Sequence, residues 1–154
     1  MAAVTARDIM TPDPVTIGRD VQVVDAARVM VDRNIGSLPV VEDGHLVGLV
    51  SEDDLIMQDV KIEFPTYIHL LDGFIMYPPA HARFEGELRK AVAATVGDVM
   101  TTDPVTVQVT TPIEDVATVL AERGVSRLPV LDGDVLVGIV SKHDIVRAIA
   151  EGRT

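Results

Sequence analysis

Hydrophobic and polar positions along the chain follow one pattern twice, at a spacing of ninety residues. Residues 5–55 and 95–145 align without a gap, and about 21 of the 51 paired positions are identical. In each copy a short extended piece, beginning at Pro14 or Pro104, precedes a stretch with helical periodicity. Two apolar runs joined by an Asp-Gly turn follow, and then a second helical stretch. The pattern predicts a β-α-β-β-α unit, present twice.

The first long helix of each unit has recognisable ends. In the first copy the apolar periodicity starts near Val21 and stops at Asn34. In the second copy Pro112 suits the first helical position, and Gly124 suits the position just after the last turn. These signals predict one long helix in each copy.

The second apolar run of each unit is unusually hydrophobic. Leu46–Val50 and Leu136–Val140 contain almost only aliphatic residues, so we expect both faces of these strands to be buried. A glycine stands inside each run, Gly48 in one and Gly138 in the other. Glycine within a strand indicates the close approach of another backbone or of a ligand.

Composition and charge narrow the function classes. The chain has 154 residues, enough for one compact unit, and a formal charge of −11. That charge argues against general binding of nucleic acid or anionic membranes, which require a basic field. Cysteine is absent, and we see neither a signal-peptide core nor an apolar run of membrane-spanning length. We therefore expect a cytoplasmic protein without nucleic-acid or membrane partners.

Three segments together resemble a known family. Asp-Val-Met-Thr at 98–101, Val-Ser-Arg-Leu-Pro-Val at 125–130 and Val-Gly-Ile-Val-Ser-Lys-His-Asp at 137–144 are similar to the CBS domain, the regulatory repeat of cystathionine β-synthase. Two such repeats in tandem resemble a Bateman module, and the resemblance covers about two thirds of the chain. It implies an α+β fold in which two β-α-β-β-α repeats pack about a pseudo-twofold axis.

The resemblance divides the chain into CBS repeat 1 at residues 1–58, an insert at 59–94 and CBS repeat 2 at 95–154. The insert holds all the aromatic residues of the chain, namely Phe64, Tyr67, Phe74, Tyr77 and Phe84. A flexible linker is rich in Gly and Ser instead, so we expect an ordered helical hairpin. It either fills a hole beside its own module or forms a dimer or partner contact. His69 and His81 in this insert show no metal-ligand spacing, so we predict no metal site.

The start of the last helix of each unit carries the sharpest site hypothesis. Ser51 and Asp54, like Ser141 and Asp144, have the spacing of a capping box, which stabilises a helix start without any ligand. The resemblance implies that the same Asp holds the ribose hydroxyls of an adenosyl ligand and that the Ser lies near ribose or phosphate. A carboxylate can accept two hydroxyl donors, and the free N–H groups of a helix start suit phosphate. Both interpretations can hold together.

The resemblance also implies that the Asp of one repeat faces the adenine pocket of the other. Cleft one would then combine Ser51, Asp54, Val105, Val125, Ser126 and Arg127. Cleft two would combine Ser141, Lys142, Asp144, Val15, Ile35, Gly36 and Ser37. The alternative for the aliphatic members is ordinary core packing.

The predicted clefts are chemically unequal. Glu52 and Asp53 lie beside cleft one, whereas Lys142 and His143 replace them in cleft two. We expect Arg127 and Lys142 to hold the phosphates of a ligand, since a guanidinium or an ammonium can pair with phosphate. The alternative for each is a solvated surface charge.

No catalytic motif is found in the sequence, so we expect a non-enzymatic protein. The leading hypothesis is a sensor that binds an adenine nucleotide (ATP, ADP or AMP), with S-adenosylmethionine or NAD as further possibilities. Binding would change the geometry of a homodimer or of the contact with a regulated protein that the sequence does not identify. The alternative is an interaction protein whose clefts are empty or structural and whose aromatic insert is the contact surface.

Overall fold

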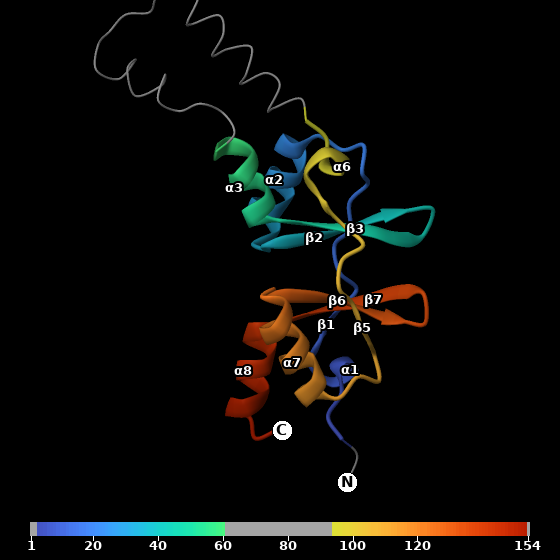
Figure 1. Cartoon of the computed structure of the whole chain (residues 1–154), viewed down its shortest axis with the longest axis vertical. Coiled ribbons are helices and arrows are strands. Elements are labelled where there is room, and N and C mark those ends of the chain that lie inside the picture. The colour runs from blue at the N-terminus through green and yellow to red at the C-terminus, as the bar shows by residue number, and fades with distance from the viewer. Residues whose placement is uncertain (1–2, 61–93, 154) are drawn as a thin grey trace, which may run out of the picture.

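The computed structural model describes residues 3–60 and 94–153, which form an α+β molecule of two similar halves placed end to end (Figure 1). The elements of the first copy are α1 (Ala6–Ile9), β1 (Thr11–Pro12), α2 (Val23–Arg33), β2 (Ser37–Glu42), β3 (His45–Ser51) and α3 (Glu52–Val60). Those of the second copy are α6 (Val96–Val99), β4 (Thr101–Thr102), β5 (Val107–Gln108), α7 (Ile113–Arg123), β6 (Arg127–Asp132), β7 (Val135–Ser141) and α8 (Lys142–Ala150).

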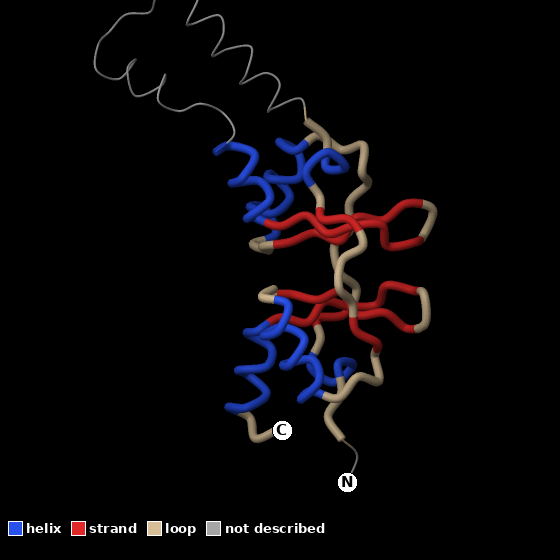
Figure 2. The backbone as a smooth tube through the Cα atoms, viewed as in Figure 1, coloured by secondary structure: helices blue, strands red, loops and turns tan. Residues whose placement is uncertain are grey.

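Two separate sheets form the centres of the two halves (Figure 2). Half one contains the three-stranded sheet β2-β3-β4, and half two contains the four-stranded sheet β1-β7-β6-β5. All pairs are antiparallel except β5 with β6. The counterpart of β5 in half one is a single parallel bridge between Ile17 and Val40. The predicted extended pieces are therefore present, though each is very short.

The two halves exchange their first segments. Strand β1 of the first copy pairs with β7, and strand β4 of the second copy pairs with β3. The short helices exchange as well, because α1 packs against α8 while α6 packs against α3 (Figure 1). Ala6 and Val96, both fully buried, each belong to the core of the opposite copy. Each half is thus completed by a short segment of the other copy, residues 6–12 or 96–102.

The ends of the long helices agree closely with the sequence signals. Asn34 and Gly124 adopt the left-handed conformation (φ 52° and 63°) directly after α2 and α7, as predicted. Pro112 is not the first helical residue, since it stands one position earlier as the N-cap of α7. Proline lacks a backbone N–H, and this costs no hydrogen bond at either position. The N–H groups of the N-cap and of the first helical residue have no acceptor within the helix.

The hairpins between the apolar runs are tight in both halves. Asp43 and Gly44 form the loop of the first hairpin with positive φ angles of 51° and 79°, which is the geometry that suits a two-residue hairpin turn. In the second hairpin the loop residues are Gly133 and Asp134, one position later than predicted. The shift occurs because Asp132 still pairs with Val135 in the sheet.

The expectation that β3 and β7 are buried on both faces is wrong. Val50 and Val140 are fully buried, but Leu49 and Ile139, which lie on the opposite faces of their strands, are only half-buried. These second faces line cavities between the halves. An apolar second face therefore identifies a cavity wall here, rather than a covered sheet.

The close approach predicted at the strand glycines is confirmed. A methyl group added to Gly48 would lie 2.5 Å from Sδ of Met100 and 2.9 Å from the carbonyl oxygen of Thr101. A methyl group on Gly138 would lie 3.0 Å from the carbonyl oxygen of Thr11. The approaching backbones are the exchanged strands β4 and β1.

The helical hairpin predicted for residues 59–94 lies, apart from its ends, outside the described residues. Among the helices of the described ranges, none combines the length and the apolar character needed to cross a membrane.

Candidate functional site

Two cavities lie between the halves, where the exchanged segments bring the copies together. The first has a volume of about 230 Å³ and the second about 360 Å³. Ser37 and Arg127, which occupy equivalent positions in the two copies, line both cavities. The cavities are therefore neighbours on either side of the pseudo-twofold axis.

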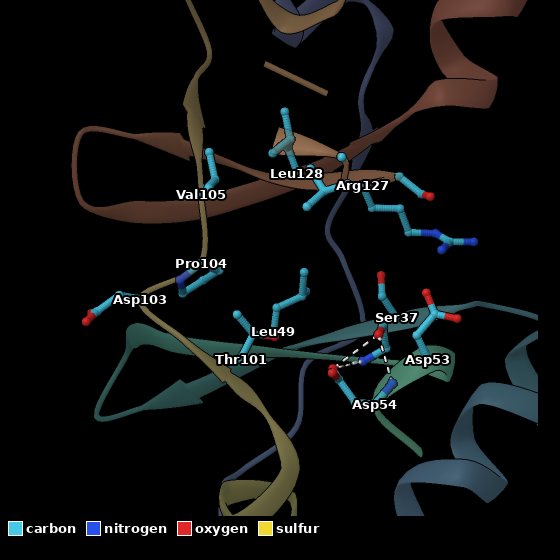
Figure 3. Close-up of a pocket in the computed structure, with 14 residues that line it drawn as sticks. Ser37, Leu49, Asp53, Asp54, Thr101, Asp103, Pro104, Val105, Arg127 and Leu128 are labelled. Carbon is cyan, nitrogen blue, oxygen red and sulfur yellow. Dashed lines mark hydrogen bonds between the residues drawn. The ribbon is translucent and has the colours of Figure 1, made fainter. Parts of the chain in front are cut away.

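Cleft one contains all the residues predicted for it. The lining includes Ser51, Asp54, Val105, Val125, Ser126 and Arg127. Leu49, Thr101, Asp53 and Asp103 also line it, although the carboxylate of Asp103 points away from the other side chains in Figure 3. The structure thus joins the helix start of α3 to the apolar segments of the second copy.

Cleft two contains six of the seven residues predicted for it. Ser141, Asp144, Val15, Ile35, Gly36 and Ser37 line the cavity. Lys142, the expected phosphate ligand, is exposed and does not contribute to the lining. The basic residues in its place are Arg147, one turn further along α8, and His143.

Both site carboxylates take part in capping boxes. Oδ2 of Asp54 accepts hydrogen bonds from the Ser51 N–H at 2.8 Å and from its hydroxyl at 3.1 Å. Oδ2 of Asp144 accepts the same pair from Ser141 at 2.8 and 3.0 Å. The cap interpretation is therefore correct, and it occupies one carboxylate oxygen in each case.

The second oxygen distinguishes the two carboxylates. Oδ1 of Asp144 is paired with the guanidinium of Arg147. Within residues 3–60 and 94–153, Oδ1 of Asp54 has neither a hydrogen bond nor an ion pair. Oδ1 of Asp54 can consequently accept a hydrogen bond from a ligand hydroxyl. Oδ1 of Asp144 already forms an ion pair with Arg147.

Arg127 lies between the clefts, with its guanidinium against Gly36. A methyl group placed on Gly36 would come within 2.7 Å of Cζ of Arg127. Gly36 lines cleft two but not cleft one. The side chain accordingly points away from Val105 in Figure 3. The sequence assigned Arg127 to cleft one, and the structure places its charged end on the side of cleft two.

The fixed charges differ between the cavities. The residues that line cleft one include three acids, Asp53, Asp54 and Asp103, and a single base, Arg127. Cleft two has two carboxylates, Asp13 and Asp144, against two guanidinium groups, those of Arg127 and Arg147. The net formal charge is −2 in the first cavity and zero in the second, with His143 counted as neutral. Electrostatics therefore favours phosphate in cleft two.

Arg147, Asp13 and Asp103 line the clefts but were not among the predicted site residues. The sequence contained a signal for Arg147. Arg147 follows Asp144 by three positions on one helix face, where side chains of opposite charge meet, and Met57 stands in its place in the first copy. Asp13 and Asp103 each precede a proline and adopt positive φ values of 50° and 48°. Such values are uncommon for residues other than glycine and recur at binding sites.

Metal ligands do not gather in the described ranges, where no three His, Asp or Glu side chains converge in a way that could hold an ion. The hypothetical ligands His69 and His81 lie outside those ranges.

Comparison with protein families identifies the repeated unit. The family model of the CBS domain matches residues 6–60 and again residues 96–151. The chain is 34% identical over 154 residues to the chloroplastic CBS domain-containing protein CBSX2 of Arabidopsis thaliana. That match covers 94% of this chain and 63% of the plant protein, so the chain spans less than two thirds of this relative's length.

Solved structures share the fold over almost the whole chain. The crystal structure of CBSX2 in complex with AMP has a TM-score of 0.73 and 30% identity, with 97% of this chain and 98% of that chain covered. The CBS domain pair of protein MJ0100, in complex with 5-methylthioadenosine and S-adenosyl-L-methionine, has a TM-score of 0.71. It covers 98% of this chain and 99% of the other at 23% identity, which shows a common fold.

Proposed function

The chain belongs to the CBS-domain family as a tandem pair of repeats, and on this premise we propose that it is a regulatory module that binds an adenosyl ligand between its halves. One observation carries the proposal. Each of two neighbouring cavities combines a Ser-Asp helix start from one copy with aliphatic side chains from the other. The AMP complex of a relative with 30% identity supports the same class of ligand.

The chemistry of cleft one suits an adenosine group. Oδ1 of Asp54, which has no partner among residues 3–60 and 94–153, can accept a ribose hydroxyl in a charge-assisted hydrogen bond. Val105 and Val125 supply apolar walls of the kind that flat ligands require. The ligand would touch both copies, so its affinity depends on how they sit against each other. Binding then favours the arrangement in which the ligand contacts are best.

The output of the module would be a change in how it contacts other chains, beginning with a second copy of itself. Val31, Ile56, Val146 and Ile149 are between 57% and 79% exposed on α2, α3 and α8. These helices lie on one side of the molecule in Figure 1. Exposed aliphatic residues on neighbouring helices are typical of an interface, so we include a homodimer in the proposal. A cytoplasmic location and a non-enzymatic role stay predictions.

Thermal unfolding in the presence of ligands tests the proposal. A ligand that binds only the folded chain at one hundred times its Kd stabilises it by about 2.7 kcal/mol, so AMP, ADP or ATP should raise Tm by several degrees. S-adenosylmethionine and NAD belong in the same screen. Asp54→Ala combined with Asp144→Ala should abolish the ligand-induced increase, while Asp43→Ala, in the distant hairpin loop, should retain it.

The double variant also loses two helix caps, so the ligand-induced change in Tm is the quantity compared, not Tm itself. An unchanged Tm with every adenosyl compound would exclude the proposal. It would favour an interaction protein that uses its exposed apolar helices instead.

A further inference from the structure

We propose that Arg127 couples the two clefts, because its single guanidinium is the group for which phosphates in both clefts compete. This inference rests on the proposed function and concerns the regulation of the same site. It predicts that a phosphate-bearing ligand in one cleft weakens the binding of a second such ligand in the other.

The position of Arg127 is the first support. Arg127 is a lining residue of both cavities and of the groove between α2 and α3. Within the described ranges it makes no ion pair or hydrogen bond through its guanidinium, which packs on the surface of Gly36. Nothing in those ranges therefore ties this cation to either cleft by a polar contact.

The departure from symmetry is the second support. The residue of the first copy equivalent to Arg127 is Ser37, which is 7% exposed and also lines both cavities. A symmetric pair would offer one guanidinium to each cleft, but this chain offers one to both. Arg127 carries a single positive charge, so a phosphate paired with it in one cleft leaves less of that charge to attract a phosphate in the other.

The surroundings fix the order in which the clefts fill. In the structure the guanidinium lies at Gly36, on the side of cleft two, where Arg147 adds a second positive charge. Cleft one without this guanidinium retains the carboxylates Asp53, Asp54 and Asp103. A nucleotide phosphate should enter cleft two first and hold Arg127 there. The second nucleotide then meets an acidic cavity and binds more weakly.

Calorimetric titration of the full chain with AMP and with adenosine tests the coupling. AMP should bind in two phases that differ about tenfold or more in affinity, within the usual range of about 5- to 150-fold for coupled sites. Adenosine lacks the phosphate, so its two phases should differ much less. Equal and independent affinities for two AMP molecules would overturn the coupling.

The Gly36→Ala variant distinguishes two hypotheses. In one, the guanidinium of Arg127 serves both clefts, and in the other it serves cleft two alone. The added methyl group displaces the flexible end of Arg127 from its position on cleft two. If the guanidinium is shared, AMP affinity should fall several-fold in one phase and rise several-fold in the other. If it belongs to cleft two alone, the affinity falls in one phase and the other is unchanged, which contradicts the proposal.

Two further variants complete the test. Gly18→Ala is the matched control, since a methyl group there meets no atom within 4 Å, and both AMP affinities should be unchanged. In the Arg127→Ala background, Gly36→Ala should no longer move the two phases in opposite directions. Should Gly36→Ala fail to fold, the unmodified chain can still contradict the coupling, through phases that are separated equally for AMP and for adenosine. Failure of every adenosine compound to bind would instead contradict the proposed function itself.

Discussion

At the scale of single residues, glycine is required where the exchanged strands cross the sheets. A side chain at Gly48 would collide with Met100 and with the backbone carbonyl of Thr101, which cannot move aside without breaking the β3–β4 pairing. We expect Gly48→Ala to lower the free energy of unfolding by about 1–3 kcal/mol, the usual cost of overpacking. Urea denaturation measures the change.

Gly18→Ala serves as the comparison for this substitution as well, because that position is open. Equal stability of the Gly48→Ala and Gly18→Ala proteins would show that β4 can yield without cost, contrary to this explanation.

How far the sequence predicts single residues depends on whether their partners are local. The Ser51–Asp54 and Ser141–Asp144 caps were predictable, since both partners lie within one helical turn. The direction in which the Arg127 side chain points was not predictable. It depends on the open surface at Gly36, which lies ninety-one positions away in the chain. Lys142 does not line cleft two, which α8 lines with His143 in its first turn and with Arg147 one turn later. The role of Lys142 as a phosphate ligand stays a prediction.

At the scale of elements, the exchanged short helices depend on their caps. α6 begins with a capping box in which Oδ2 of Asp98 accepts hydrogen bonds from the Thr95 N–H at 2.9 Å and from its hydroxyl at 3.0 Å. These bonds, the backbone one foremost, hold the pKa of Asp98 below its ordinary value of 3.8, and Arg19 acts in the same direction. The charged form is therefore the one that folding favours.

A pH dependence follows from this direction. Since the folded pKa is below the unfolded one, the stabilisation by Asp98 is complete above pH 3.8 and is lost as the pH falls through the folded value. The Asp98→Asn protein should be less stable than the unmodified one at pH 7, and the difference should shrink below pH 3.8. Denaturation at a series of pH values measures it, and a difference that stays constant down to pH 3 would be inconsistent with this role.

The sequence predicted most of the elements but not strands β1 and β4. α2 and α7 were recognisable from periodicity and from their left-handed end residues. Strands β1 and β4 were not, because two residues carry no periodicity and their partners lie in the opposite copy. The clefts depend on this exchange, so their residues could be assigned from the family resemblance but not from local pattern.

At the scale of the whole molecule, the exposed aliphatic residues of the helices predict which surface forms the homodimer interface. Val146 on α8 and Val135 at the start of β7 are equally exposed, at 60% each. α8 lies on the helical side of the molecule in Figure 1, whereas Val135 belongs to the hairpin on the opposite side. Val146→Asp should shift the chain from dimer to monomer in sedimentation, and Val135→Asp should not. A dimer that persists with Val146→Asp would place the interface elsewhere.

The exchange of first segments has a consequence for the origin of such a chain. One repeat has both a segment to donate, such as α1 with β1, and a site that receives one, beside β7 or β3. Two separate copies of a single repeat would therefore have every part needed to form a dimer by exchanging their first segments. Joining them in one polypeptide changes a bimolecular encounter into an intramolecular one. It also frees the two copies to diverge, and Arg127 facing Ser37 is a difference that two identical chains could never acquire.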